Sequence, residues 1–193
     1  MLRWLTNILD IKNLLGVQRV TPDPAYPANE TVMRFNGTTY AFNTSGDFDI
    51  ITTVGGVQVT THHSSVGIFS GTMDEGTDVI VRGSITDLDA GVNCNFIAFA
   101  NYLTAIRVAT SHHTLKTIDL RNAGDVHNFY RYTPPSIPTI YANAQYSDLA
   151  NFAQGLIDDS TVTDGTLWID PAQQYASYVI TAAQAKGWSV YYL

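Results

Sequence analysis

The segment LTAIRV at residues 103–108 is followed by LKTIDLRN at residues 115–122, and both start with the spacing leucine-x-x-isoleucine-x-aliphatic. Similar short apolar segments recur at residues 137–143, 166–170 and 189–193. Their central aliphatic residues, Ile118, Ile140, Leu167 and Val190, are 22, 27 and 23 residues apart. A period of about 20–29 residues with this spacing is typical of proteins that stack one strand per repeat. We therefore expect a short parallel sheet in the second half of the chain.

The two segments at residues 103–108 and 115–122, with Asn122 after the second strand, resemble the leucine-rich repeat. The closest form is the short one common in Bacteroidetes surface proteins and their phages. The resemblance covers residues 84–193 and implies a leucine-rich-repeat-like β/α solenoid. The fold class predicted for the whole chain is therefore α+β: an N-terminal helix, a β-rich segment and this solenoid.

Two helices are predicted among the later repeats. The first begins at Ser147 or Asp148, which are good N-cap residues, and its apolar residues follow at helical spacing. The second covers residues 172–186 and ends at Gly187. Residues 188–193 then form a last strand, whose outer edge has unpaired backbone groups. Either an N-terminal segment folds back over that edge, or a neighbouring protein covers it.

Residues 31–83 form the β-rich segment. Asn36-Gly37 is a strong type I′ turn signal, and it predicts a hairpin over residues 31–43. Further strands are expected between residues 48 and 82, with a turn at Gly55-Gly56 and breaks at other glycines. The sequence leaves two arrangements open for these strands: they extend the parallel sheet or form a small separate sandwich.

Residues 1–20 are predicted to form an amphipathic anchor helix. Its apolar stripe consists of Leu2, Trp4, Leu5, Ile8, Ile11 and Leu15. Residues 21–30 contain three prolines and are expected to be a semi-rigid tether. The stripe docks either on its own domain or on a partner, and the tether favours the partner. Asp10 and Lys12 interrupt the apolar region, so a secretory signal peptide is not expected.

The sequence shows no catalytic signature, and we expect a non-enzymatic protein without cofactor or metal. The pairs His62-His63 and His112-His113 lie among threonine and serine, where solvated loop histidines are expected instead of zinc ligands. A net charge of −7 argues against a nucleic-acid partner. No run of 18 apolar residues is present, so no membrane partner is expected. Cys94 is the only cysteine, which excludes an intrachain disulfide.

An aromatic segment, formed by Phe129, Tyr130, Arg131 and Tyr132, is predicted to lie in a long loop between repeats. Long loops of repeat proteins often bind ligands, and tyrosine and arginine are favoured at interfaces. This loop is therefore a candidate site for a protein or sugar partner, and packing within the domain is the alternative.

These features lead to a functional hypothesis. Only 14% of the residues are charged, and the predicted last strand has no cap. We expect a structural or adhesion component of a bacteriophage particle, such as a head decoration, head fibre or tail protein, that assembles in the host cytoplasm. Its expected partners are other virion proteins in a homo- or hetero-oligomer, with a host-surface protein or glycan as a further candidate. The alternative is a bacterial surface module that binds a protein or glycan.

Overall fold

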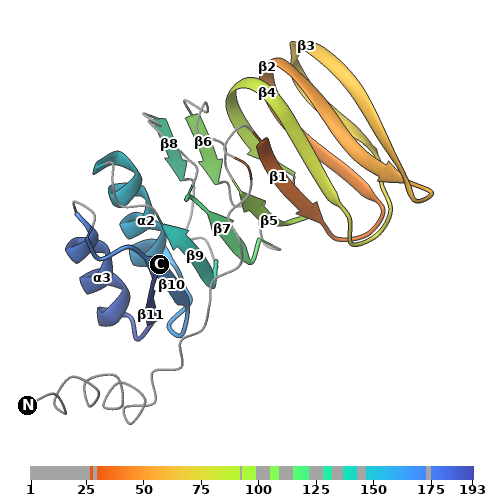
Figure 1. Cartoon of the computed structure of the whole chain (residues 1–193). Coiled ribbons are helices and arrows are strands. Elements are labelled where there is room, and N and C mark those ends of the chain that lie inside the picture. Colours follow the sequence, from red (N-terminus) through yellow and green to blue (C-terminus); the bar gives the residue numbers. More distant parts are fainter. Residues whose placement is uncertain are drawn as a thin grey trace, which may run out of the picture.

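A computed structural model describes residue 27 and residues 30–91, 93–98, 105–108, 115–121, 128–131, 137–142, 147–172 and 175–193 (Figure 1). The predicted anchor helix at residues 1–20, with its stripe from Leu2 to Leu15, lies outside these residues. Of the predicted tether, only Pro27 and Glu30 are described.

The described residues are mostly in β-strands. The strands are β1 (Glu30–Phe35), β2 (Thr39–Val54), β3 (Val57–Thr72), β4 (Asp78–Ala90), β5 (Cys94–Ala98), β6 (Ala105–Val108), β7 (Thr117–Asp119), β8 (Asn128–Arg131), β9 (Thr139–Ala142), β10 (Thr166–Ile169) and β11 (Ser189–Tyr192). The helices among them are α2 (Ser147–Asp159) and α3 (Ala176–Ala185). Neither helix is long and apolar enough to cross a membrane.

All these strands belong to one mixed sheet, in the order β11-β10-β9-β7-β5-β1-β4-β2-β3. β4 is the branch point, because β1 pairs with its first half and β6 pairs with residues near its end. β8 extends the branch beyond β6. The strands before and after residue 84 are therefore hydrogen-bonded into a single sheet.

The predicted α+β fold with a leucine-rich-repeat solenoid is wrong. The two best-matching segments are not neighbouring repeats, because β6 pairs with β4 and β8, whereas β7 pairs with β5 and β9. Only 12 residues separate Ile106 from Ile118, which is too few for a full repeat of about 20–29 residues. The described residues between Cys94 and Arg131 include the strands β5, β6, β7 and β8.

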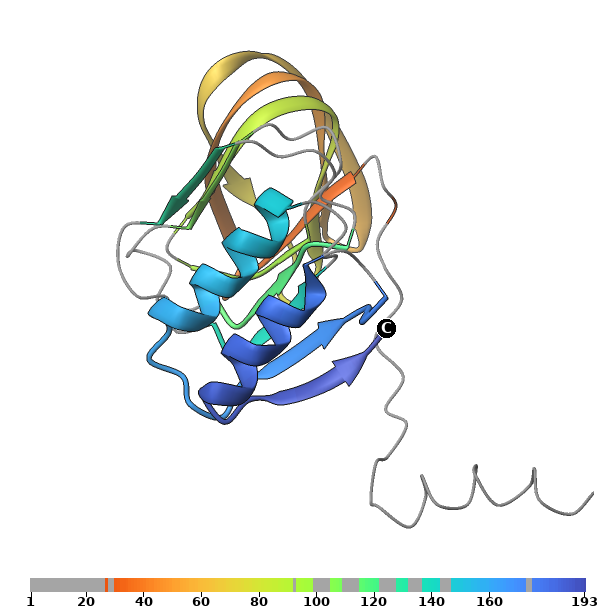
Figure 2. The same ribbon diagram turned by 90° about the vertical axis from the view of Figure 1, so that its left-hand side faces the viewer.

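The longer spacings do predict correct strand neighbours. Ile118 lies opposite Ile140, Ile140 opposite Leu167, and Leu167 opposite Val190, all in parallel register. The first three of these residues are fully buried in the hydrophobic core. Both predicted helices are confirmed, with α2 starting at Ser147 and α3 starting at Ala176 instead of residue 172. Figure 2 shows the two helices side by side on one face of the parallel strands.

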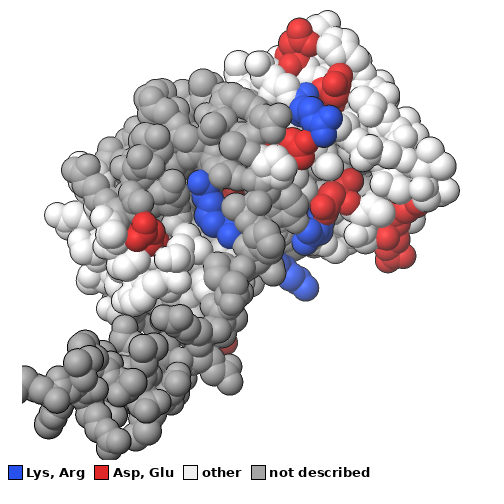
Figure 3. All heavy atoms as spheres, viewed as in Figure 1, with Lys and Arg blue, Asp and Glu red and all other residues white. Residues whose placement is uncertain are grey.

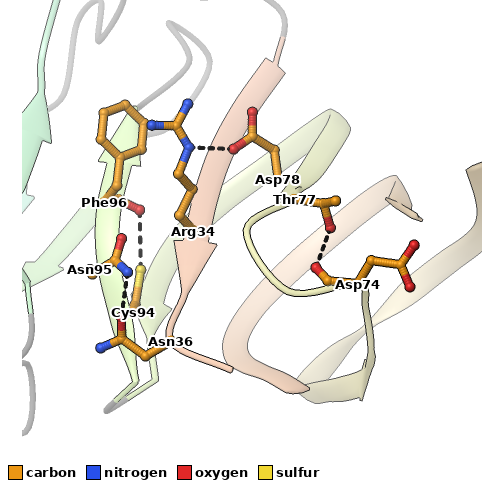
Figure 4. Close-up of polar contacts among 8 residues, drawn as sticks. All are labelled: Arg34, Asn36, Asp74, Thr77, Asp78, Cys94, Asn95 and Phe96. Atoms are coloured by element: carbon orange, nitrogen blue, oxygen red, sulfur yellow. Dashed lines mark hydrogen bonds and ion pairs between the residues drawn. The ribbon is translucent and has the colours of Figure 1, made fainter. Parts of the chain in front are cut away.

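Of the two predicted glycine turns, one joins a hairpin and the other does not. Gly55 and Gly56 have φ angles of +62° and +75°, and they connect β2 to β3 in an unbroken antiparallel register from Val54↔Val57 to Thr39↔Thr72. The predicted hairpin over residues 31–43 is wrong, since β4 lies between β1 and β2. Asn36 is held from another strand: Asn95 Nδ2 donates to its side-chain oxygen at 2.6 Å (Figure 4).

Cys94 provides a probe of this core. Its thiol is fully buried on β5, and desolvation raises its pKa to about 12. At about pH 8 only about 10⁻⁴ of such a thiol would be ionised. We expect a thiol reagent such as DTNB to leave the native protein unlabelled and to react with one thiol per chain in urea. Stoichiometric labelling of the native protein within minutes would contradict this burial.

Candidate functional site

Within the described residues the sheet ends at three strands, β3, β11 and, on the branch, β8, and β3 is much the longest of them. β3 contains 16 residues, and within the described part of the chain only β2 pairs with it. It lies at the outer end of the sheet in Figure 1, far from the helices. A row of unpaired backbone N–H and C=O groups along a free edge is a template for another strand.

β3 has none of the residues that usually protect such an edge. Residues 57–72 contain no lysine, arginine, aspartate, glutamate or proline, and no bulge interrupts the pairing with β2. Val66 and Ile68 leave 78% and 77% of their surface exposed, and Val57 and Val59 are exposed as well. β3 is therefore the candidate interaction edge of this molecule.

The two faces of β3 differ. His63 and Phe69 point toward the core side of the sheet, where their rings lie 5.7 Å and 5.0 Å from the ring of Phe48. Val66 and Ile68 lie on the other face, because side chains alternate along a strand. His62 shares that face, with its Nδ1 3.0 Å from Asp49 Oδ1.

The predicted position of His62-His63 in a loop is wrong, since both lie within β3. Alternation sends the two rings to opposite faces, so they do not share a site. The described residues hold no group of three histidine, cysteine or acidic side chains placed to bind a metal ion. His112 and His113 lie outside the described residues.

The tip of the β2–β3 hairpin is held by one carboxylate from the loop before β4. Asp74 accepts hydrogen bonds from the backbone N–H groups of Gly55 at 2.8 Å and Gly56 at 2.7 Å. The Asp74 N–H donates to the carbonyl of Thr53, and Thr77 Oγ1 donates to the Asp74 carbonyl. These contacts fix the tip from which the candidate edge begins.

The Asp74 contacts predict a pH dependence. The Gly56 and Gly55 N–H groups lower the pKa of Asp74 in the folded state, so its stabilisation is complete above the ordinary carboxyl pKa and is lost as pH falls through the lowered value. Replacing Asp74→Asn should reduce the free energy of unfolding in urea at about pH 6, and this difference should shrink progressively as the pH falls below the ordinary carboxyl pKa of about 3.9. Glu75→Gln is the control, and a difference that does not change with pH would refute the role.

A hollow of about 550 Å³ opens on the same face as Val66 and Ile68, beside the start of β4. Its lining is largely polar and includes Arg34, Thr53, Gln58, Thr77 and Asp78. Arg34 Nε donates to Asp78 at 2.6 Å, and its guanidinium lies 4.6 Å from the centre of the Phe96 ring (Figure 4). The hollow has the hydroxyl, amide and charged groups that bind small polar ligands.

At the other end of the sheet, an aromatic row crosses the parallel strands toward β11. The Arg121 guanidinium lies 4.5 Å from the centre of the Tyr141 ring, and the rings of Tyr141, Trp168 and Tyr191 follow in a stack at 5.8 Å and 4.7 Å. Trp168 is only 4% exposed. The row is therefore internal packing, and the exposed apolar residues at this edge are Tyr192 and Leu193.

The charged residues on the described surface in Figure 3 do not mark a site. Figure 3 shows acidic and basic residues interspersed on the visible described surface, without a large patch of one sign. Several of them are paired, as in the contact of Arg82 with Glu30 at 2.6 Å.

The predicted loop position of the aromatic segment is wrong for three of its residues. Phe129, Tyr130 and Arg131 lie in β8, a strand paired with β6, and their side chains are not among the described ones. Tyr132 and the anchor-helix residues lie outside the described part. The sequence interpretation missed β3, although the absence of charge over residues 57–72 is visible in the sequence.

Comparison with protein-family models, curated proteins and solved structures finds no match for this chain. The resemblance to the leucine-rich repeat therefore depends on the sequence pattern alone.

Proposed function

We propose that this protein is a non-enzymatic structural subunit that is built into a larger particle through its sheet edges. The observation that carries this proposal is β3: sixteen residues of uncharged, unprotected edge strand with Val66 and Ile68 largely exposed. Such an edge is an aggregation hazard in a free monomer and an adhesive surface in an assembly.

A bacteriophage particle is the setting that we propose for this subunit, as a component of its head or tail. Two features support it. Few residues are charged, and the polar positions of β3 are occupied by threonine, serine, glutamine and histidine. The open edge at β11 gives the subunit another place to contact a neighbour.

Two measurements test this function. Analytical ultracentrifugation of the purified full chain should show a defined oligomer whose population rises with concentration. Mass spectrometry of phage particles produced from the genome that encodes the chain should find its peptides in a fixed ratio to the major capsid protein. A chain that stays monomeric and is missing from the particles would refute the proposal.

The hollow beside β4 favours a second candidate function, a module that binds a glycan. Its threonine hydroxyls, the Gln58 amide and the Arg34–Asp78 pair offer the donors and acceptors that sugars use. Glycan-array screening of the native chain and of Gln58→Ala separates the two candidates. Binding that is lost in the variant would support the module, whereas the structural subunit requires no such binding.

A further inference from the structure

We propose that β3 pairs antiparallel with β3 of a second copy of this chain, around a two-fold axis at Gly67. This inference rests on the proposed function and names the first contact of the assembly. The shared strand would join two sheets into one continuous sheet across the axis.

The free hydrogen-bonding groups of β3 follow from its hairpin. Val54 and Val57 flank the two-residue turn and form a hydrogen-bonded pair, so odd-numbered residues of β3 direct their N–H and C=O groups toward β2. The even-numbered residues direct theirs toward the free edge. An antiparallel partner must therefore place even-numbered residues opposite even-numbered residues, which a two-fold axis at Gly67 does.

Side chains select this register among the two-fold possibilities. With the axis at Gly67, Val66 lies opposite Ile68 of the second copy, and Ile68 lies opposite its Val66. Each of these exposed β-branched side chains then covers the other, which is a stabilising cross-strand pair. An axis at Ser65 would instead place Ile68 opposite a histidine, and an axis at Val66 would place Ile68 opposite a serine.

The opposite face also fits. The Gly67 residues of the two copies meet at the axis. A β-carbon built at Gly67 would have no heavy atom within 4 Å, apart from those of Gly67 and its two chain neighbours. Phe69, which is half-buried, lies diagonal to the glycine of the second copy and can cover its exposed backbone.

Charge favours a second copy at this edge. The chain has a net charge of −7, so two copies repel each other over much of their surface. Residues 62–72, which overlap in this register, contain no acidic or basic side chain other than His62 and His63. The pairing therefore brings no carboxylates together along the shared strand.

Cysteine pairing tests the register in the full-length chain. Ser64 and Ser70 are predicted to lie opposite each other across the interface, at a Cα separation of about 5.5 Å, within reach of a disulfide. A mixture of Ser64→Cys and Ser70→Cys chains should give a cross-linked dimer on mild oxidation, whereas neither variant should cross-link alone. A mixture of Thr60→Cys and Ser70→Cys is the control and should stay uncross-linked, and the buried Cys94 should not react.

A charge at the interface tests the energetics. Ile68→Lys should weaken self-association by at least about tenfold in sedimentation equilibrium, because it places an ammonium group opposite Val66. Thr60→Lys is the matched control, on the same face and strand but outside residues 62–72, and should leave association unchanged. Ile68 is largely exposed, so circular dichroism and urea unfolding should show that both variants fold.

The outcomes separate the two proposals. An oligomer that forms the Ser64–Ser70 cross-link and dissociates with Ile68→Lys supports this register. An oligomer that shows neither effect overturns the register and leaves the structural role standing. A native chain that is monomeric at all concentrations overturns the β3 pairing, and the structural role is overturned as well only if the chain is also missing from the particles.

Discussion

Replacing Gly46→Ala is expected to destabilise the protein by about 3–5 kcal/mol, one of the largest single effects in the fold. Gly46 has a φ angle of +144°, which side chains other than glycine rarely adopt. A β-carbon there would lie 2.0 Å from the backbone oxygen of Ser84 and 3.0 Å from the Ile85 Cα. Because backbone atoms cannot rotate away, β2 and β4 would have to separate. Urea unfolding followed by tryptophan fluorescence measures the loss.

The local cause is a bulge between the two long strands. Ser45 pairs with Asp87, but Gly46 pairs with Ile85, so Thr86 is an extra residue on β4. Such a bulge bends a strand and increases its twist. Glycine at position 46 lets the two backbones approach closely at the bend.

Two control substitutions separate the cost of the positive φ angle from the cost of the steric clash. Gly37 also has a positive φ, +88°, but nothing lies within 4 Å of its missing side chain, so Gly37→Ala should cost only about 1 kcal/mol. A β-carbon at Gly91 would lie 2.2 Å from the Ala41 oxygen, although Gly91 has no positive φ. Gly91→Ala therefore isolates the steric part. Equal costs at Gly46 and Gly37 would refute the close approach.

Local signals predict turns and helices better than strand partners. Gly55-Gly56 and Asn36-Gly37 are both strong turn signals, yet only the first joins strands that pair. The pairing of β1 is decided by residues distant in sequence: Met33 lies opposite Val79 of β4 on one side and Ile97 of β5 on the other. A turn specifies the path of a few residues, whereas the partner of a strand depends on which apolar side chains it buries.

Two of the three glycine breaks expected in the β-rich segment mislead for a related reason. Gly71 lies within β3 and Gly83 lies within β4, whereas Gly76 does lie in the turn between these strands. At Gly83 a β-carbon would lie 2.6 Å from the Asp47 oxygen, so this glycine permits close strand contact instead of ending a strand. The short strands expected in this region are parts of three long strands, β2, β3 and β4. Because β3 was expected as separate short strands, its long open edge was not predicted.

Replacing Asp119→Ala is the second large effect, and it is expected to cost about 3–5 kcal/mol in the free energy of unfolding. The side chains of Asp119 and Arg121 are only 4% and 12% exposed, and the Asp119 carboxylate accepts hydrogen bonds from Arg121 Nε at 2.9 Å and Nη2 at 2.5 Å. It also accepts the backbone N–H of Arg121 at 3.0 Å. The substitution leaves a buried guanidinium without its bidentate carboxylate, a loss that urea unfolding should detect.

The Arg34–Asp78 pair is the matched control, because its atoms lie as close, at 2.6 Å, but its side chains are 42% and 28% exposed. Water screens such a pair, so Asp78→Ala should cost only about 0–1 kcal/mol. The double variant Asp119→Leu/Arg121→Met removes both buried charges and should cost less than Asp119→Ala alone, since no charge is left unpaired. If the double variant were as unstable as the sum of its single changes, the guanidinium would not be the cause. The loss of stability would then come from lost packing between the Arg121 side chain and the Tyr141 ring.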